Sequence, residues 1–387
     1  KPLQTIKVSQ RGWVLAVMNA VRKLGLNKFT TQEAYQIESE MHRLFPGNRN
    51  VRPKIRQQLQ VLRGVYSRFM SYMDPPQHTE QRGLLSDAFT PRIIENLRRP
   101  IQESVDELIE KVLPAGKMDL LEEFSLPFSS SLIMDMLGLP REDRIQFIRW
   151  INVFFEYLGS EQNDFELAKR AQDNYIILMD YLRGVMEDRR RNPREDLVTA
   201  IVCLQDSHSH IPEIRFLSLL ITVVHGGFET TMTLISNGMY DLLAHPDQMQ
   251  KLRENPDLIS GAVEEMLRYD GPFKAITRSA KEDFQLHGRE IRKGDTLMLL
   301  LGASGRDPEV FKDPHQFNIE RKPNPHQAFG VGIHFCLGAN LARLEAQLAV
   351  NSLLRRMPNL RLATEKIRWR KSHLLRQLEA LPVEYSE

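Results

Sequence analysis

One stretch of this chain decides its fold: Phe329-Gly-Val-Gly-Ile-His-Phe-Cys336-Leu-Gly338. It places one of only two cysteines between glycines, directly before a segment at 339–357 whose apolar residues recur at helical spacing. The free N–H groups and the dipole at the start of a helix stabilise a negatively charged sulfur. Glycines carry no side chain that would keep a flat partner away from the backbone. The stretch therefore predicts a ligand-type cysteine at a helix N-terminus.

Two interpretations of Cys336 are open on the residues alone. A single cysteine in a reducing compartment is more often a buried structural residue. The surrounding glycines, with His334 as a hydrogen-bond donor and Phe329 as an aromatic cover, favour the second interpretation, a sulfur ligand for a haem iron.

The ten residues follow the pattern F-G-x-G-x-H-x-C-x-G, and this resembles the haem-ligand loop of the cytochrome P-450 superfamily, soluble bacterial type. With the motifs described below, the resemblance extends over about 65–387. It implies haem b as the cofactor, Cys336 as the iron ligand, and Phe329, His334 and Gly338 as further cofactor-binding residues. The fold that it implies is mainly α, a helical haem-binding domain with small β-sheets.

Composition agrees with a soluble globular protein. The chain has 387 residues, of which 42% are hydrophobic and 26% are charged, and no apolar run reaches the length of a membrane span. The two cysteines, Cys203 and Cys336, exclude a disulfide framework and fit a reducing compartment. The first residues show no signal-peptide pattern. We expect a cytoplasmic protein without a membrane partner.

Periodicity predicts helices over most of the chain after residue 74. Strand signals are confined to a hairpin at 283–291 and a strand at 296–301, and 304–335 is predicted to be long and irregular. The predicted helices cover 91–112, 124–138, 141–159, 164–190, 211–244, 258–269 and 339–357.

The most apolar predicted helix contains Gly226-Gly227-Phe228-Glu229-Thr230-Thr231. Paired glycines, an acid and hydroxyls oppose both helix propensity and burial, so the segment is either a solvent-exposed turn or a functional site. As a site, Gly227 would admit a ligand to the backbone and Thr230 would open the helix by diverting a hydrogen bond. The segment is similar to the family pattern [AG]-G-x-[DE]-T-[TS]. That resemblance implies Glu229 and Thr230 as the catalytic acid–alcohol pair, which relays protons and positions dioxygen.

A helix is predicted to open after Asp74-Pro75-Pro76, and it places His78 and Arg82 four residues apart on one face. A solvated basic helix edge is one interpretation. The other comes from the resemblance to the family's D-P-P-x-H-x-x-x-R, in which His and Arg bind the haem propionates. By the same resemblance Arg278 and His334 are the remaining propionate partners, a sound arrangement because charge-assisted hydrogen bonds hold carboxylates strongly.

Glu265 and Arg268 form an i,i+3 pair on a predicted helix. Such pairs usually lie on the surface and contribute little to stability. The family's E-x-x-R element instead supports the irregular segment, with a downstream arginine that matches Arg321. The resemblance therefore implies that these three residues are structural.

The resemblance implies a monooxygenase that activates dioxygen and inserts one oxygen atom into a small organic substrate. No flavin or ferredoxin motif is recognisable, so electrons would come from a ferredoxin and its reductase or from a flavodoxin-type donor; Arg343 is a candidate contact for that donor. A peroxygenase driven by hydrogen peroxide is an alternative, disfavoured by the intact Glu229–Thr230 pair. Proximity to the motifs predicts a substrate pocket; its expected residues are His225, Gly226, Phe228, Phe273 and Ile276.

The first 64 residues depart from the family. They carry 12 Lys and Arg against 3 Glu, and they predict three short helices at 11–24, 30–43 and 51–63. Part of this segment resembles the winged-helix domain of Dam-replacing type restriction endonucleases. Plain structure is the alternative to a DNA contact, and nucleic acid would bind only through 1–64, making the protein a DNA-binding haem fusion or sensor. The expected contacts are Arg49, Arg52, Lys54, Arg56 and Gln57.

Overall fold

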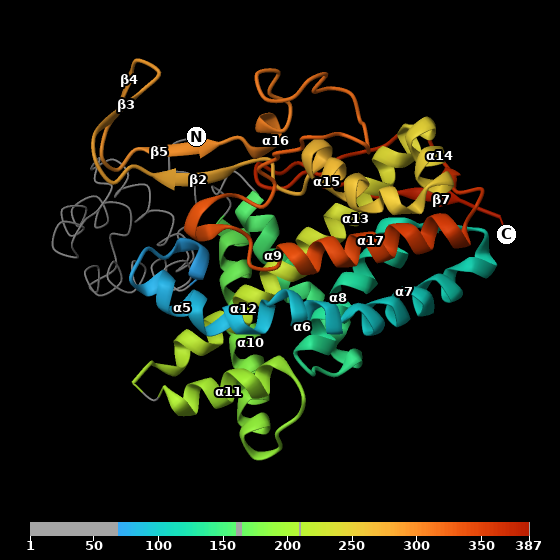
Figure 1. Cartoon of the computed structure of the whole chain (residues 1–387). Coiled ribbons are helices and arrows are strands. Elements are labelled where there is room, and N and C mark those ends of the chain that lie inside the picture. Colours follow the sequence, from blue (N-terminus) through green and yellow to red (C-terminus); the bar gives the residue numbers. More distant parts are fainter. Residues whose placement is uncertain (1–68, 160–164, 209, 387) are drawn as a thin grey trace, which may run out of the picture.

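The fold was analysed in a computed structural model, which describes residues 69–159, 165–208 and 210–386 (Figure 1). The mainly α fold with small sheets that the sequence predicts is confirmed. The three helices predicted within 1–64 lie outside the described residues.

Helices follow one another through the first two thirds of the described chain. The first seven are α5 (Gln77–Ser86), α6 (Pro91–Asn96), α7 (Arg98–Val112), α8 (Leu126–Met136), α9 (Arg144–Gly159), α10 (Phe165–Arg191) and α11 (Leu197–Ser207). The remainder are α12 (Glu213–Gly227), α13 (Glu229–Ala244), α14 (Pro246–Glu254), α15 (Ile259–Asp270), α16 (Leu301–Ser304) and α17 (Ala339–Arg356). A π-helical segment, Leu120–Ser125, leads into α8, and short 3₁₀ turns occupy Met70–Tyr72, Asp87–Phe89, Leu113–Ala115, Arg141–Asp143, Pro256–Leu258 and Gly332–His334.

Three small antiparallel sheets account for the described strands. β3 (Phe284–Leu286) and β4 (Arg289–Ile291) form the predicted hairpin, and β2 (Ile276–Ser279) pairs with β5 (Thr296–Leu299). The third sheet has the order β1-β7-β6 and joins distant segments. Its strands are β1 (Lys117–Asp119), β6 (Arg361–Leu362) and β7 (Pro382–Glu384).

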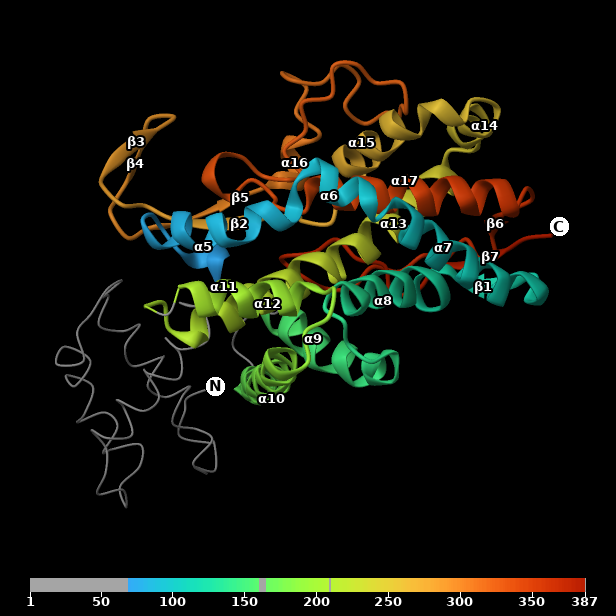
Figure 2. The ribbon, with the colours of Figure 1, turned by 60° about the horizontal axis from the view of Figure 1, so that its bottom comes forward.

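The helices α12 and α13 run through the middle of the molecule. They pack against α8 on one side, and α13 packs against α15 and α17 on the other (Figure 2). Two hydrophobic cores flank this axis. One lies among α7, α13, α15, α17 and the three-stranded sheet, and the other among α8, α9, α10, α11 and α12. Any residue in the middle of α12–α13 is therefore held from two sides.

Several element boundaries differ from the sequence prediction. The helix predicted at 211–244 is divided at Phe228, whose backbone (φ −91°, ψ −71°) departs from helical values. The helix predicted at 91–112 is divided at Leu97, ahead of Pro100. The helices α11, α14 and α16, the strand β2 and the three-stranded sheet were not predicted. Strands of two or three residues are too short for alternation to be visible in the sequence.

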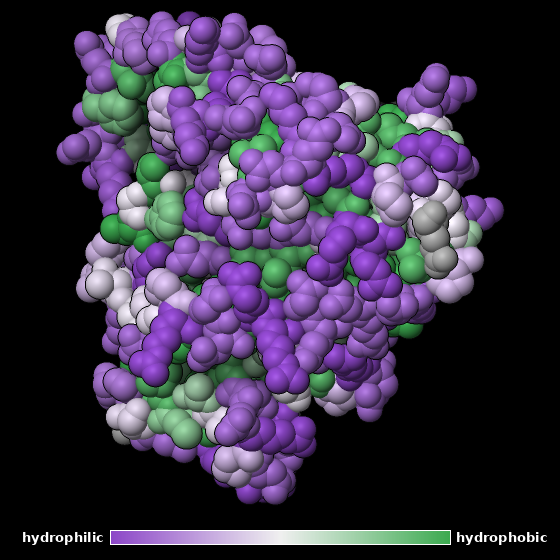
Figure 3. All heavy atoms as spheres, turned by 45° about the vertical axis from the view of Figure 1, so that its right-hand side comes forward, coloured by the Kyte–Doolittle hydropathy of each residue, from purple (hydrophilic) through white to green (hydrophobic). Residues whose placement is uncertain are grey.

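The segment Glu213–Ala244 is long and apolar enough to cross a membrane by length and composition. In its most apolar window, however, 78% of the residues are buried inside the fold, as expected for a core helix. The face of the molecule drawn in Figure 3 is mostly hydrophilic, with apolar residues scattered in small groups.

Candidate functional site

The cysteine loop is shaped by glycines. Gly330 and Gly332 both have φ +70°, a left-handed backbone that residues with a side chain rarely adopt. The turn that they form brings the N–H of Cys336 to the carbonyl oxygen of Phe329, at 2.9 Å. Helix α17 begins at Ala339, so the cysteine immediately precedes a helix N-terminus, as the sequence predicts.

Opposing influences act on the Cys336 thiol. Burial raises the pKa of the thiol above its ordinary value, whereas the N–H of Gly338 and the charges of Arg82 and Arg343 act to lower it. Cys336 is half-buried, and the hydrogen bond from Gly338 and the two guanidinium groups favour the anionic form of its sulfur. Such a setting suits a thiolate bound to a metal better than a free thiol.

Four cationic or ionisable side chains gather beside this loop. His78 and Arg82 come from α5, Arg278 from β2, and His334 from the loop itself, which lies between those two elements in Figure 1. The rings of His78 and His334 are 4.3 Å apart, centroid to centroid. Burial lowers the pKa of His334, and the neighbouring His78, Arg278 and Arg82 lower it further.

We call these four side chains the cation cluster; the acid that acts on its histidines, Asp74, is itself paired with Lys281. His78 is buried, yet neither of its ring nitrogens has a hydrogen-bond partner among the residues that the structure describes. Burial and Arg82 lower the pKa of His78, while the single acid that acts on it, Asp74, has a weaker influence. A buried polar group without a partner is costly, so a bound anion is the expected complement. The residues present fit a porphyrin that carries two carboxylates.

The middle of α12–α13 is open on one side. Thr230 donates its hydroxyl to the carbonyl oxygen of Gly226 at 2.6 Å, across the break at Phe228. A methyl group built on Gly226 meets no atom within 4 Å, whereas one on Gly227 collides with Ile133 of α8. The expectation that Gly227 admits a ligand is therefore wrong: Gly227 admits the neighbouring helix α8, and Gly226 faces the open space.

Glu229 lies on another side of the helix from that opening. Its carboxylate is buried and accepts a hydrogen bond from Nε2 of Gln377 at 2.7 Å. Its second oxygen has no partner among the described residues. Burial raises the pKa of Glu229, against the smaller lowering influence of Gln377. The sequence analysis did not identify Gln377, because nothing in its local sequence indicates a contact 148 residues away.

The expected pocket residues separate into three environments. His225 is enclosed by the rings of Phe69, Phe154 and Phe155, and burial lowers its pKa to about 3, so it is neutral. Phe228 is fully buried within a hydrophobic core and does not face the open side. Gly226 is exposed, and both remaining residues, Phe273 and Ile276, are half-buried.

The structure brings Glu265, Arg268 and Arg321 together. Arg268 donates from Nε and Nη2 to the two carboxylate oxygens of Glu265, at 2.7 and 2.8 Å, and both side chains are completely buried. Arg321 lies 3.1 Å from the same carboxylate. Arg268 also donates to three carbonyl oxygens of the irregular segment, those of Gly305, Pro314 and Gln316. The network thus ties α15 to the segment that leads into the cysteine loop.

Arg343 is not the free surface cation that a donor contact would require. Its Nε and Nη2 bind the two carboxylate oxygens of Glu264, at 2.6 and 2.9 Å, and its guanidinium lies 4.6 Å from the ring centroid of Phe329. The sequence analysis did not identify Glu264, which stands next to Glu265 and has no motif of its own.

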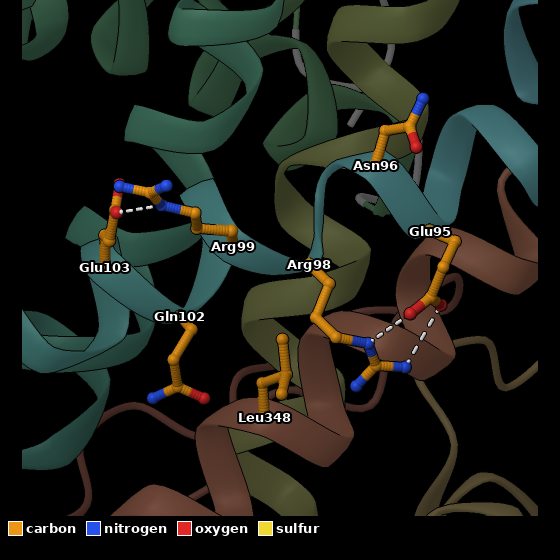
Figure 4. Close-up of a pocket in the computed structure, with 7 residues that line it drawn as sticks. All are labelled: Glu95, Asn96, Arg98, Arg99, Gln102, Glu103 and Leu348. Atoms are coloured by element: carbon orange, nitrogen blue, oxygen red, sulfur yellow. Dashed lines mark hydrogen bonds and ion pairs between the residues drawn. The ribbon is translucent and has the colours of Figure 1, made fainter.

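A groove on another part of the surface holds none of the predicted site residues. It has a volume of about 540 Å³ and lies where α6 and α7 meet α17 (Figure 4). Its charged side chains pair with one another, Arg98 with Glu95 and Arg99 with Glu103. It offers no unpaired charge to a ligand among the residues that line it, and we assign it no role.

Comparison with known proteins explains why the cysteine loop and the cation cluster occur together. Residues 48–358 match the cytochrome P-450 family, which is most of the chain. The chain belongs to the cytochrome P-450 family. Members of this family bind haem b, and the protein is a cytochrome P-450 monooxygenase. The cation cluster and the cysteine loop are thus consistent with the cofactor that the family carries.

Relatives of this P-450 work in bacterial biosynthesis. It is 39% identical to the polyketide biosynthesis cytochrome P-450 PksS of Bacillus subtilis (strain 168) over 81% of this chain and 77% of that protein. It is 41% identical to the cytochrome P-450 monooxygenase PikC of Streptomyces venezuelae over 81% and 74%. Among solved structures, P-450 BioI in complex with hexadec-9Z-enoic acid ligated acyl carrier protein aligns with a TM-score of 0.79, at 40% identity over 84% of each chain.

The N-terminal resemblance is also matched. Residues 9–74 correspond to the Dam-replacing HTH domain. This match extends ten residues beyond the expected limit at Gly64 and overlaps the P-450 match over 48–74.

Proposed function

We propose that this P-450 hydroxylates, or oxidises in a related way, a mainly apolar organic molecule, with Cys336 as the haem ligand. The observation that carries the proposal is the convergence of the Cys336 loop with His78, Arg82, Arg278 and His334. The bound haem supplies dioxygen activation, which the Cys336 thiolate promotes by donating electron density.

The roles of the remaining residues follow from their positions. The histidines and arginines of the cation cluster would bind the two haem propionates; Phe329 and Gly338 shape the loop around the sulfur. Thr230 is half-buried beside the exposed Gly226, and on this proposal its hydroxyl donates to dioxygen. Burial raises the pKa of the Glu229 carboxyl, which favours its proton-carrying form. Release of its hydrogen bond to Gln377 would free this carboxyl to pass the proton toward Thr230.

The electrons come from a ferredoxin and its reductase, or from a flavodoxin-type donor. Support for a docking face around the cysteine loop comes from three exposed apolar side chains. They are Val331, Ile333 and Phe335, exposed by 66%, 49% and 42%. Exposed apolar groups of this kind mark contact surfaces. Arg343, which pairs with Glu264, is withdrawn from this role.

The substrate is assigned by class. The ring of His225 is neutral and lies among buried aromatic side chains, so the interior beside α12 disfavours charged groups. A long acyl or polyketide-type chain is compatible with this apolar interior and with the kinds of molecule named for the relatives. Titration with hexadec-9-enoic acid, read as a shift of the Soret band, tests the class; no shift with this acid or other long-chain lipids would contradict it.

Thr230→Val is expected to uncouple reductant consumption from product formation. The substitution keeps the shape of the side chain but removes the hydroxyl, so the hydrogen bond to dioxygen is lost and peroxide is released instead. The loss of one hydrogen bond corresponds to about a tenfold fall in coupled product. The measurement is product and peroxide formed for each reductant consumed, with a substrate found by the Soret titration.

Thr233→Val is the matched control. Thr233 makes the same kind of bond one turn later, from its hydroxyl to the carbonyl oxygen of Glu229 at 2.8 Å, but it is buried in the core. Its replacement should leave coupling unchanged. Equal coupling in Thr230→Val and wild type would remove Thr230 from the mechanism.

A second candidate function concerns the N-terminal segment. Its match to the Dam-replacing HTH domain and its 12 cationic residues against 3 acidic ones support binding to duplex DNA. On this proposal the chain divides into a basic segment, 1–64, and a monooxygenase domain, 65–387, and it acts as a DNA-binding haem fusion or sensor.

Replacing four cations of this segment by Ala should weaken duplex binding by the full-length protein. The plot of log affinity against log salt should also become less steep, by about 3 to 4 in the magnitude of its slope. The four are Arg49, Arg52, Lys54 and Arg56. Four exposed cations of α6 and α7 provide the control: Arg92, Arg98, Arg99 and Lys111. Absence of duplex binding by the wild type at low salt would exclude this function.

A further inference from the structure

Three side chains meet beside the cysteine loop and form a group separate from the Glu265 network. They are Glu264 of α15, His326 of the irregular segment and Arg343 of α17. The Glu264 carboxylate accepts hydrogen bonds from Nε and Nη2 of Arg343. It also accepts one from Nε2 of His326, at 3.0 Å. Burial opposes ionisation of Glu264, but the bonds from Arg343 and His326 outweigh it and lower its pKa to about 2.

Each partner of Glu264 is in turn connected to the loop. The Arg343 guanidinium lies over the ring of Phe329, whose carbonyl oxygen accepts the N–H of Cys336. His326 accepts the N–H of Ala328 at its Nδ1, at 3.3 Å, directly before Phe329. One carboxylate thereby restrains the start of the cysteine loop at two points, through a stacked guanidinium and through a bridging imidazole.

We propose that Glu264 is a positioning residue for the cysteine ligand. It holds Arg343 against Phe329, and His326 against Ala328, so that the loop keeps the Cys336 sulfur where it would bind a haem iron. The inference rests on the proposed role of Cys336 as the haem ligand.

The geometry distinguishes this group from an ordinary surface ion pair. Glu264 and Arg343 are 26% and 29% exposed, the contact is bidentate, and the guanidinium is also stacked on an aromatic ring. Because the planar Arg343 guanidinium binds Glu264 and stacks on Phe329 at the same time, its orientation is fixed. A lysine ammonium cannot make both contacts in this way. The pair Lys251–Glu320 of the same region is about half exposed at both ends and has a single contact at 2.9 Å.

The test is made on the full-length holoenzyme, reduced with dithionite under carbon monoxide. Glu264→Gln should accelerate the loss of the strongly red-shifted Soret band, which reports thiolate ligation, about tenfold relative to wild type. Arg343→Lys should accelerate it as well, because the ammonium neither forks nor stacks. The double variant should lose the band no faster than the faster single variant, because both changes break the same contact chain.

Glu320→Gln is the matched control and should decay at the wild-type rate. Unfolding measured in parallel by far-UV circular dichroism separates positioning from general destabilisation, since only positioning accelerates band loss while the fold persists. A wild-type decay rate in Glu264→Gln, band loss that only follows unfolding, or additive effects in the double variant would each overturn the inference. If Glu264→Gln yields no folded holoenzyme, Arg343→Lys decides alone: an accelerated loss supports the inference and an unchanged rate overturns it. A wild-type protein without the red-shifted band would overturn the proposed function itself, and this inference with it.

Discussion

Cys336→Ser is expected to abolish the red-shifted Soret band of the reduced carbon monoxide complex and to reduce monooxygenation to background. A serine oxygen is a harder and weaker electron donor than a thiolate, so neither the spectrum nor dioxygen activation survives the change. The loop itself should keep its shape, because the backbone bond from residue 336 to Phe329 does not involve the sulfur. The difference spectrum of purified protein is the measurement.

The second cysteine supplies the control. Cys203 lies in α11 and is exposed, and Cys203→Ser should leave the spectrum and the activity as in wild type. A red-shifted band retained in Cys336→Ser would show that another residue binds the iron.

Arg268→Leu is expected to lower the free energy of unfolding by about 3 to 5 kcal/mol. The variant leaves the Glu265 carboxylate buried with less compensating charge, and it removes the donors for three carbonyl oxygens of the irregular segment. Because that segment leads into the cysteine loop, haem should also dissociate more easily. Denaturant unfolding of the holoenzyme measures the first effect, and transfer of haem to an acceptor protein measures the second.

Arg99→Leu tests whether burial is the cause. Arg99 pairs with Glu103 at 2.7 Å, but the two side chains are 88% and 63% exposed, so the pair should contribute little to stability and Arg99→Leu should leave the free energy of unfolding close to that of wild type. Similar losses in the two variants would contradict the view that the Glu265–Arg268 contact supports the fold.

Several features could be predicted from the sequence because they depend on neighbouring residues. The apolar spacing along 141–159 and 339–357 predicts α9 and α17, three residues too early at the start of α9 and one residue too late at the end of α17, since a helix is a local structure with a period of its own. The cysteine loop is local for the same reason. Its glycines, histidine and cysteine lie within ten positions, and their chemistry is apparent before any fold is known.

Contacts between distant segments could not be predicted in this way. The three-stranded sheet pairs Met118 with Val383, and nothing near either residue indicates the other. The partner of Glu229 is likewise remote: motif matching identified the acid, but only packing shows that it binds Gln377. Side-chain direction depends on the packing of whole helices, which single-sequence periodicity does not contain.

By itself, the sequence determined the family and the helical character of the chain, and it supplied the candidate cysteine ligand and propionate-binding residues, because each of these depends on a short run of neighbouring residues. The tertiary structure alone decided which glycine faces open space, since Ile133 of α8 fills the position beside Gly227. It alone decided that Arg343 is bound to Glu264 rather than free. Both outcomes depend on the distance between two packed helices, α12 and α8 in the first case and α17 and α15 in the second. Contacts between distant segments of the chain determine these distances.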